Sequence, residues 1–214
     1  MIVKVCGLSA AGPALAASEA GADYLGLVFA PSSRRIDEDQ AAGLVEVLAE
    51  RGVAADQWVG VFVNESLAEV NRVARRCRLG RVQISGDEPW EYLLGLDLPA
   101  IKVVRPAVPA DLARVAEEVA RWRQRMPSLL VLLDSHAPGL YGGSGRQADW
   151  DLAAQAAGRF PFLLAGGLSP NNVGLAVERV GPLGVDASSG LESNGVKDEG
   201  KIRAFVAEAR RAGQ

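Results

Sequence analysis

The feature that most constrains the fold is an alternation of two kinds of segment along the whole chain. Short runs of β-branched and aliphatic residues alternate with stretches of helical period, a pattern typical of repeated βα units around a parallel sheet. Strands are expected at eight places: Ile2–Cys6, Tyr24–Phe29, Trp58–Val63, Arg81–Ile84, Ala100–Val104, Leu129–Asp134, Phe162–Ala165 and Gly184–Ala187. Helices are expected at Asp37–Arg51, Ser66–Arg76, Pro109–Met126, Asp149–Gly158, Pro170–Val180 and Asp198–Arg211. The stretches after the first and fourth strands have less regular patterns.

The number of strands favours a closed barrel. Eight parallel strands in 214 residues fit a (β/α)8 barrel at the small end of its size range, whereas a doubly wound open sheet usually has about five to seven strands. No linker, low-complexity tract or change in composition divides the chain. We therefore predict an α/β protein with a single-domain (β/α)8 TIM barrel over residues 1–214, whose active site lies at the carboxyl ends of the strands.

Composition and charge argue against several classes of function. The net charge of −3 offers no net basic face to a nucleic acid. No apolar run approaches the ~18–20 residues of a membrane span, and Met1 leads straight into an apolar strand, so we expect a cytoplasmic protein with no membrane partner. Two cysteines and one histidine are too few for a disulfide framework or a histidine-rich metal site, so no metal is expected.

Two of the predicted strands end on residues that can transfer protons. Cys6 is followed by Gly7, which leaves room for a ligand beside the sulfur, although simple burial of the thiol is the alternative. A catalytic thiol needs a stabilised thiolate, and Lys4 lies on the same face of the strand. Asp134 ends an apolar strand and is either a cap of the next loop or a general acid whose pKa the apolar surroundings raise. His136 is interpreted as an ordinary loop residue.

Two loops late in the chain predict a phosphate site. Gly166 and Gly167 precede a predicted helix, and Ser188 and Ser189 follow the eighth strand. In many barrels the loops after strands seven and eight bind phosphate through backbone N–H groups and hydroxyls. A third glycine run, 142–146, lacks the lysine and the spacing of a nucleotide-binding loop and is interpreted as a lid. We therefore expect a small phosphorylated substrate.

Several short strings, spread from one end of the chain to the other, carry a family resemblance. They are Lys4-Val5-Cys6-Gly7-Leu8, Gly21-Ala22-Asp23-Tyr24-Leu25-Gly26-Leu27-Val28-Phe29, Pro31-Ser32-Ser33-Arg34-Arg35, Val59-Gly60-Val61-Phe62-Val63-Asn64, Val82-Gln83, Leu133-Asp134, Gly142-Gly143-Ser144-Gly145, Asp149-Trp150, Leu164-Ala165-Gly166-Gly167-Leu168 and Gly184-Val185-Asp186-Ala187-Ser188-Ser189-Gly190-Leu191-Glu192. In this order they are highly specific, and the chain resembles the phosphoribosylanthranilate isomerases of tryptophan biosynthesis.

The resemblance implies an Amadori rearrangement of N-(5-phosphoribosyl)anthranilate, in which an aminoaldose becomes an aminoketose without metal, cofactor or redox partner. It places the general base on Cys6 and the general acid on Asp134. The other residues that it implicates would bind substrate: Arg35 the anthranilate carboxylate, Asp186 a position near the amine, Gln83 the substrate without a specified group, and Gly166, Gly167, Ser188 and Ser189 the phosphate. A planar guanidinium suits a carboxylate well.

The chain departs from the family pattern at a few positions. Ser85 stands where the family usually has histidine, which removes a side chain near the substrate ring, and Arg34 stands where proline is commoner. Two other functions remain open: another sugar-phosphate isomerase of the phosphate-binding barrels, and a non-catalytic binder of a phosphorylated metabolite. A histidine-pathway isomerase would have an aspartate in place of Cys6, and the pairing of Cys6 with Asp134 argues against a silent binder. The outward helix faces allow a monomer or a homodimer.

Overall fold

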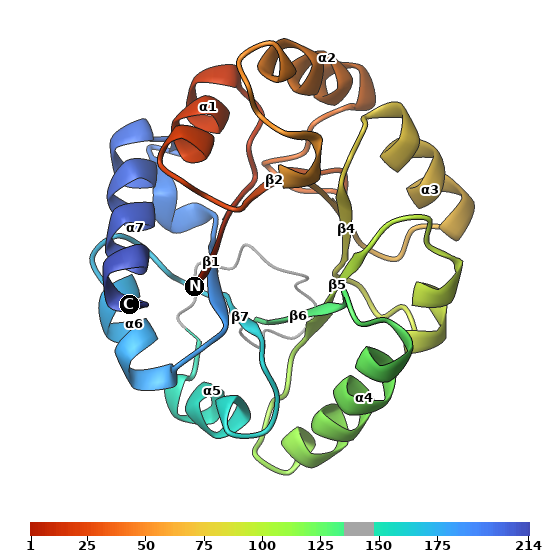
Figure 1. Ribbon diagram of the computed structural model, residues 1–214, viewed down its shortest axis with the longest axis vertical. Helices are drawn as coiled ribbons and strands as arrows, with labels where there is room; N and C mark the ends of the chain where they lie inside the picture. The colour runs from red at the N-terminus through yellow and green to blue at the C-terminus, as the bar shows by residue number, and fades with distance from the viewer. Residues whose placement is uncertain (135–147) are drawn as a thin grey trace.

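A computed structural model gives the fold and describes residues 1–134 and 148–214. Within these residues, eight parallel strands pair in sequence order and close into a barrel (Figure 1). They are β1 (Ile2–Cys6), β2 (Tyr24–Val28), β3 (Trp58–Phe62), β4 (Arg81–Ile84), β5 (Ala100–Val104), β6 (Leu130–Leu133), β7 (Leu163–Leu164) and β8 (Gly184–Ala187). The predicted (β/α)8 barrel is confirmed, and the pairing of β1 with β8 excludes the open sheet.

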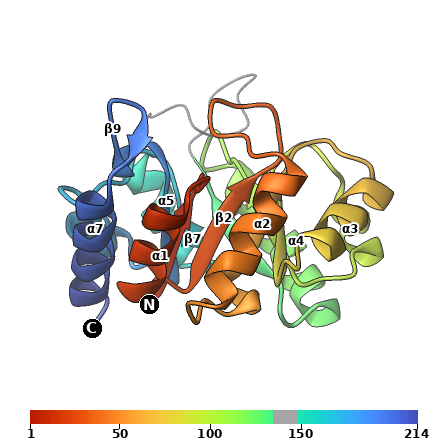
Figure 2. The same cartoon turned by 90° about the horizontal axis from the view of Figure 1, so that it is seen from above.

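Helices surround the barrel as an outer ring (Figures 1 and 2). They are α1 (Ala11–Glu19), α2 (Glu38–Ala49), α3 (Leu67–Arg76), α4 (Asp111–Arg125), α5 (Trp150–Ala157), α6 (Val173–Val180) and α7 (Glu199–Ala212), with short 3-10 helices η1 (Ala55–Gln57), η2 (Trp90–Gly95) and η3 (Ser189–Leu191). Four helices begin directly after a predicted first residue, because the side chains of Asp37, Ser66, Asp149 and Asp198 accept N–H groups of the first turn. No helix of the described residues is long and apolar enough to cross a membrane.

The structure differs from the sequence pattern around three strands. After β1, α1 buries only alanines, so it presents no stripe of large apolar residues. After β4, the described chain forms only η2. Helix α6 begins at Val173 rather than at Pro170, because Ser169 and Asn172 form a turn in which the Ser169 N–H donates to Asn172 Oδ1 at 2.8 Å.

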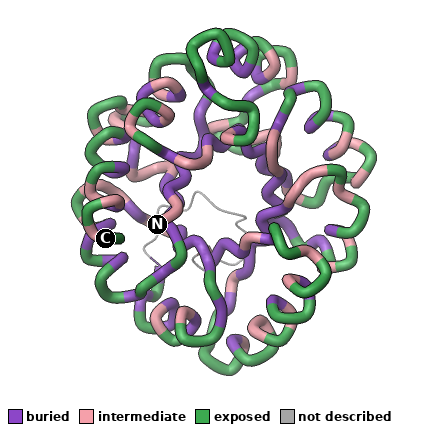
Figure 3. Tube along the Cα trace, viewed as in Figure 1, coloured by how far each residue is buried: buried purple, intermediate pink, exposed green. Residues whose placement is uncertain are grey.

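The interior of the barrel holds its own apolar cluster, separate from the larger core between strands and helices. Its buried members are Val59, Ile101, Val103, Leu132, Leu163 and Ala165. Ile2 packs against this cluster, and because side chains alternate along a strand, Lys4 and Cys6 face the interior as well. Figure 3 shows the buried ring that the strands form inside the more exposed helices.

Candidate active site

Three side chains meet inside the barrel where β1 and β8 pair. Lys4 and Asp186 are register partners on the two strands, and Lys4 Nζ lies 2.8 Å from Asp186 Oδ1. Lys4 is fully buried. Burial acts to lower the pKa of Lys4, but the Asp186 carboxylate and the Cys6 thiol raise it to about 12. A charged ammonium therefore lies beside Cys6 at neutral pH.

Cys6 ends β1 and is almost wholly buried. Burial raises the pKa of the Cys6 thiol; Lys4 and Lys197 act in the opposite direction without cancelling it, and Asp186 adds to the rise. Lys4 thus acts in the predicted direction, but desolvation is the larger effect. A Cβ at Gly26 of β2 would lie 2.8 Å from Cys6 Sγ, so this glycine makes the space that the sulfur occupies.

Asp134 follows β6, and a cation that was not among the predicted site residues lies close to it. Arg105, directly after β5, places Nη2 3.8 Å from Asp134 Oδ2, while its Nη1 donates to the Ser85 carbonyl at 3.0 Å. The surroundings of Asp134 are therefore more polar than its apolar strand indicates. The signal for Arg105 in the sequence is its place at the carboxyl end of a barrel strand.

Gln83 and Ser85 line the same end of β4. Gln83 is buried, and its Nε2 donates to Ser85 Oγ at 3.0 Å. Gln83 Oε1 is buried and has no hydrogen-bond partner among the described residues. Leaving a buried acceptor unsatisfied costs about 1–3 kcal/mol, so the site favours a ligand that donates a hydrogen bond there.

The structure brings together the two loops that the sequence assigns to phosphate. Gly166 and Gly167 have φ values of 100° and 66°, in the left-handed region that favours glycine. The loop is fixed by Asn172, whose Nδ2 donates to the Gly167 carbonyl at 3.0 Å. A Cβ at Gly190 would clash with the backbone of Leu168. The loop after β7 therefore packs directly against the loop after β8.

A small hairpin after β8 brings two charged residues, Glu192 and Lys197, to this end of the barrel. The sequence interpretation did not assign either of them to the site. Strands β9 (Glu192–Ser193) and β10 (Val196–Lys197) form an antiparallel pair (Figure 2). Asn194 and Gly195 connect them, with φ values of 53° and 79°. Asn-Gly between two short extended segments is a strong hairpin signal, and it was available in the sequence.

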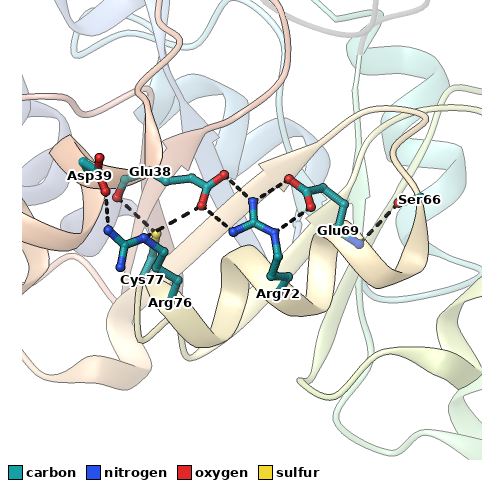
Figure 4. Close-up of polar contacts among 7 residues, drawn as sticks. All are labelled: Glu38, Asp39, Ser66, Glu69, Arg72, Arg76 and Cys77. Atoms are coloured by element: carbon teal, nitrogen blue, oxygen red, sulfur yellow. Dashed lines mark hydrogen bonds and ion pairs between the residues drawn. The ribbon is translucent and has the colours of Figure 1, made fainter.

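Arg35 lies apart from the other predicted site residues. It is exposed and lines a cavity of about 640 Å³ whose other lining residues are Phe29, Ala30, Pro31, Ile36, Asp37, Glu38, Asp39, Gln40, Phe62, Val63, Glu65, Glu69 and Val73. Two carboxylates that line the cavity share one partner: Arg72 of α3 bridges Glu38 of α2 and Glu69 of its own helix at 2.5 and 2.7 Å (Figure 4). None of the other predicted site residues lines this cavity.

Some predicted features lie outside the described residues, namely His136 and the glycine run 142–146. Within residues 1–134 and 148–214, no group of three or more histidine, cysteine, aspartate or glutamate side chains is arranged to hold a metal ion.

Comparison with known proteins identifies what this barrel is similar to. A family model described as N-(5'phosphoribosyl)anthranilate (PRA) isomerase matches residues 3–208. An N-(5'-phosphoribosyl)anthranilate isomerase of Roseiflexus castenholzii is 49% identical over 216 residues, which cover 99% of each chain. The enzyme of the same name from Dehalococcoides mccartyi is 41% identical over 95% of this chain and 93% of its own.

Solved structures agree with the sequence matches. The phosphoribosyl anthranilate isomerase of Thermotoga maritima superposes with a TM-score of 0.82 at 33% identity, over 99% of this chain and 100% of that chain. Another phosphoribosyl anthranilate isomerase, solved with reduced 1-(o-carboxyphenylamino)-1-deoxyribulose 5-phosphate, has a TM-score of 0.79 at 32% identity and the same coverage. The family resemblance read from the sequence is confirmed, together with the isomerase function in tryptophan biosynthesis that it implied.

Proposed function

The chain belongs to the N-(5'-phosphoribosyl)anthranilate isomerase family, and we propose that Cys6 and Asp134 are the base and acid with which it performs the Amadori rearrangement. The observation that supports this most strongly is the placement of Cys6 in the barrel interior beside Lys4 and Asp186. Burial raises the pKa of this thiol while the Lys4 ammonium favours its thiolate. These opposing effects suit a group that must take up and release a proton in each turnover.

In the proposed reaction, Asp134 donates a proton to the furanose ring oxygen of N-(5-phosphoribosyl)anthranilate. The ring opens, and the anthranilate nitrogen forms a Schiff base with C1. The Cys6 thiolate then removes the proton from C2, which gives an enolamine, and tautomerisation of the enolamine gives the aminoketose. Hydrogen moves only within the substrate and between it and the two side chains, so the reaction needs no cofactor or metal.

Substrate binding divides among the remaining residues. Asp186 faces the anthranilate amine from the interior, and Gln83 offers an acceptor whose hydrogen-bonding capacity is unused among the described residues. The Gly166-Gly167 loop and Ser188-Ser189 hold the phosphate through backbone N–H groups and hydroxyls. Arg35 meets the anthranilate carboxylate, which requires its exposed side chain to turn from the cavity beside α2 toward the barrel mouth. Fixing the substrate at both ends orients C2 for the base.

We infer the class of ligand, the location and the assembly state from the family as well. The partner is a small phosphorylated molecule rather than a nucleic acid or a membrane, and the enzyme works in the cytoplasm as a monomer or a homodimer. A Thermotoga maritima structure at 33% identity and a TM-score of 0.80 contains monomers generated from a dimeric phosphoribosylanthranilate isomerase, which supports either assembly.

The test is a fluorescence assay in which purified protein consumes N-(5-phosphoribosyl)anthranilate. Turnover by the parent and its loss in Cys6→Ser and Asp134→Asn would support the assignment. Tight substrate binding without turnover in the parent would instead indicate a metabolite binder. Turnover of only a histidine-pathway sugar phosphate would indicate the other isomerase function.

A further inference from the structure

Three charged side chains link the loop after β2 to the hairpin after β8, and we call Arg34, Glu192 and Lys197 the mouth bridge. Arg34 donates two hydrogen bonds to Glu192, from Nε to Oε1 at 2.6 Å and from Nη2 to Oε2 at 3.0 Å. Lys197 Nζ donates to the same Glu192 Oε1 at 2.7 Å. The three side chains are 19%, 10% and 6% exposed. Charged groups buried to this extent form an ordered unit rather than solvated surface.

The mouth bridge touches both halves of the proposed site. Arg34 packs over Gly7, the residue after Cys6: a Cβ there would lie 2.7 Å from Arg34 Cδ and 2.9 Å from Ser188 Oγ. Lys197 Nζ donates to the Ser188 carbonyl at 2.8 Å and to Ser188 Oγ at 3.3 Å. With Glu192, these contacts occupy the three donors of the ammonium. Lys197 therefore acts on a phosphate through Ser188 and not as a direct ligand.

Lys197 also acts on Cys6. The described charges that act on Cys6 come from four segments: Lys4 of β1, Asp186 of β8, Lys197 of β10 and Arg34 of the loop after β2. The influence is mutual, since Cys6 acts to raise the pKa of Lys197 while burial lowers it overall. Lys4 is neutralised by its ion pair with Asp186. The charges of Lys197 and Glu192 are therefore a second influence on the ionisation of the Cys6 thiol.

We propose that Lys197 is a positioning residue that couples the two halves of the site: it orients Ser188 for the phosphate and supplies a cation beside the thiolate of Cys6, while Glu192 and Arg34 hold it there. The proposal rests on the proposed function, in which Cys6 is the base and Ser188 binds phosphate. It assigns the hairpin a role in catalysis. It also predicts that removing Lys197 and removing Glu192 shift the midpoint of Cys6 ionisation in opposite directions.

The test measures ionisation of Cys6 in a Cys77→Ser background, so that one thiol titrates. Thiolate absorbance is followed against pH and corrected with the Cys6→Ser/Cys77→Ser protein, which removes the tyrosine signal. Lys197→Met is expected to raise the midpoint by at least ~0.5 pH units, because a cation near the thiolate is lost. Glu192→Gln is expected to lower the midpoint, because Lys197 and Arg34 lose their counter-charge. Lys197→Arg should restore the parent midpoint.

Lys201→Met is the matched control. Lys201 Nζ donates to the Glu192 carbonyl at 2.6 Å, so it anchors the same hairpin without contacting Ser188. The midpoint of Cys6 ionisation in Lys201→Met should equal that of the parent. A merely structural role for Lys197 predicts equal shifts in Lys197→Met and Lys201→Met, and that result would overturn the proposal. Shifts of the same sign in Lys197→Met and Glu192→Gln would overturn it as well.

Inorganic phosphate as an inhibitor reports on the other half of the site. Lys197→Met is expected to weaken inhibition several-fold and to raise KM for the substrate, whereas Lys201→Met is not. Unchanged inhibition would refute the link through Ser188. The thiol titration needs no substrate, so it tests the coupling to Cys6 even if the protein failed to turn over N-(5-phosphoribosyl)anthranilate, which would refute the proposed function separately.

Discussion

Asp186→Asn tests the buried ion pair beside the proposed base. The substitution keeps the size of the side chain but leaves the fully buried Lys4 ammonium without its partner at 2.8 Å. Removing one member of a buried pair costs about 3–5 kcal/mol, because the remaining charge stays desolvated. In a chain of this length each kcal/mol shifts Tm by roughly 2–4 °C. Thermal unfolding near pH 8, followed by circular dichroism, is therefore expected to show Tm lowered by roughly 6–20 °C.

The pH dependence of this loss has a definite sign. The pKa of Lys4 rises from 10.5 to about 12 in the folded protein, a difference worth ~2 kcal/mol. Because the folded-state pKa is raised, the contribution is complete below pH 10.5 and is lost as the pH rises through about 12. The gap in unfolding free energy between the parent and Asp186→Asn should therefore be largest near neutral pH and should narrow by ~2 kcal/mol in alkali.

A surface pair provides the control. Glu19→Gln breaks an ion pair with Arg203 whose side chains are 52% and 48% exposed, and such pairs contribute at most ~1 kcal/mol. Two results would refute the reasoning for Asp186: a Tm equal to that of the parent, or a stability gap that stays constant from neutral pH into alkali.

Three further substitutions test the assigned roles. Cys6→Ser should lower kcat by at least ~100-fold while KM changes little, because a hydroxyl is a far weaker base; Cys77→Ser is the silent control, and wild-type turnover in Cys6→Ser would contradict the assignment. Asp134→Asn should lower kcat by at least ~100-fold and remove the alkaline limb of the pH–kcat profile, and a retained rate with the same profile would exclude Asp134 as the acid. Ser188→Asp should raise KM and weaken inhibition by inorganic phosphate, since it places a negative charge in the proposed phosphate site; equal inhibition of variant and parent would place the phosphate elsewhere.

The barrel was predictable because its strands are buried on both faces. Such strands appear as apolar runs with sharp ends, and β1 was predicted with its observed bounds, Ile2–Cys6. Helices with side-chain caps were predictable for a similar reason, as at Asp37, where a capping carboxylate directly precedes the apolar stripe. The irregular stretches carry weaker information, because α1 packs through small alanines and leaves no period of large residues.

The candidate site was only partly predictable, since strand ends fix positions but not pairings. Cys6, Asp134 and the loop glycines follow from their places at the ends of strands. The Lys4–Asp186 pair joins residues 182 positions apart in sequence, so it depends on the closure of β8 onto β1. Arg105 contacts Ser85 and Asp134, which follow the two strands on either side of β5, so its partners depend on the strand order. Lys197 contacts Ser188 and Glu192, which lie nine and five positions away in the same loop and hairpin. The Asn194-Gly195 turn shows that one of these partners could have been found from local sequence.

The adjacent residues Arg34 and Arg35 show that a motif match does not give the direction in which a side chain points. The family pattern assigns the carboxylate-binding role to Arg35, yet Arg34 is the one whose aliphatic stem lies over Gly7 and whose guanidinium is held by Glu192. Arg35 is bridged through its backbone to Val28 and turns its side chain to the cavity beside α2. The two arginines lie at the end of a turn in which the Arg35 N–H donates to the Ser32 carbonyl at 3.2 Å, and their side chains contact different parts of the molecule. Recruiting Arg35 to a substrate carboxylate therefore requires its side chain to turn from that cavity toward the barrel mouth, where the Arg34–Glu192 pair already lies.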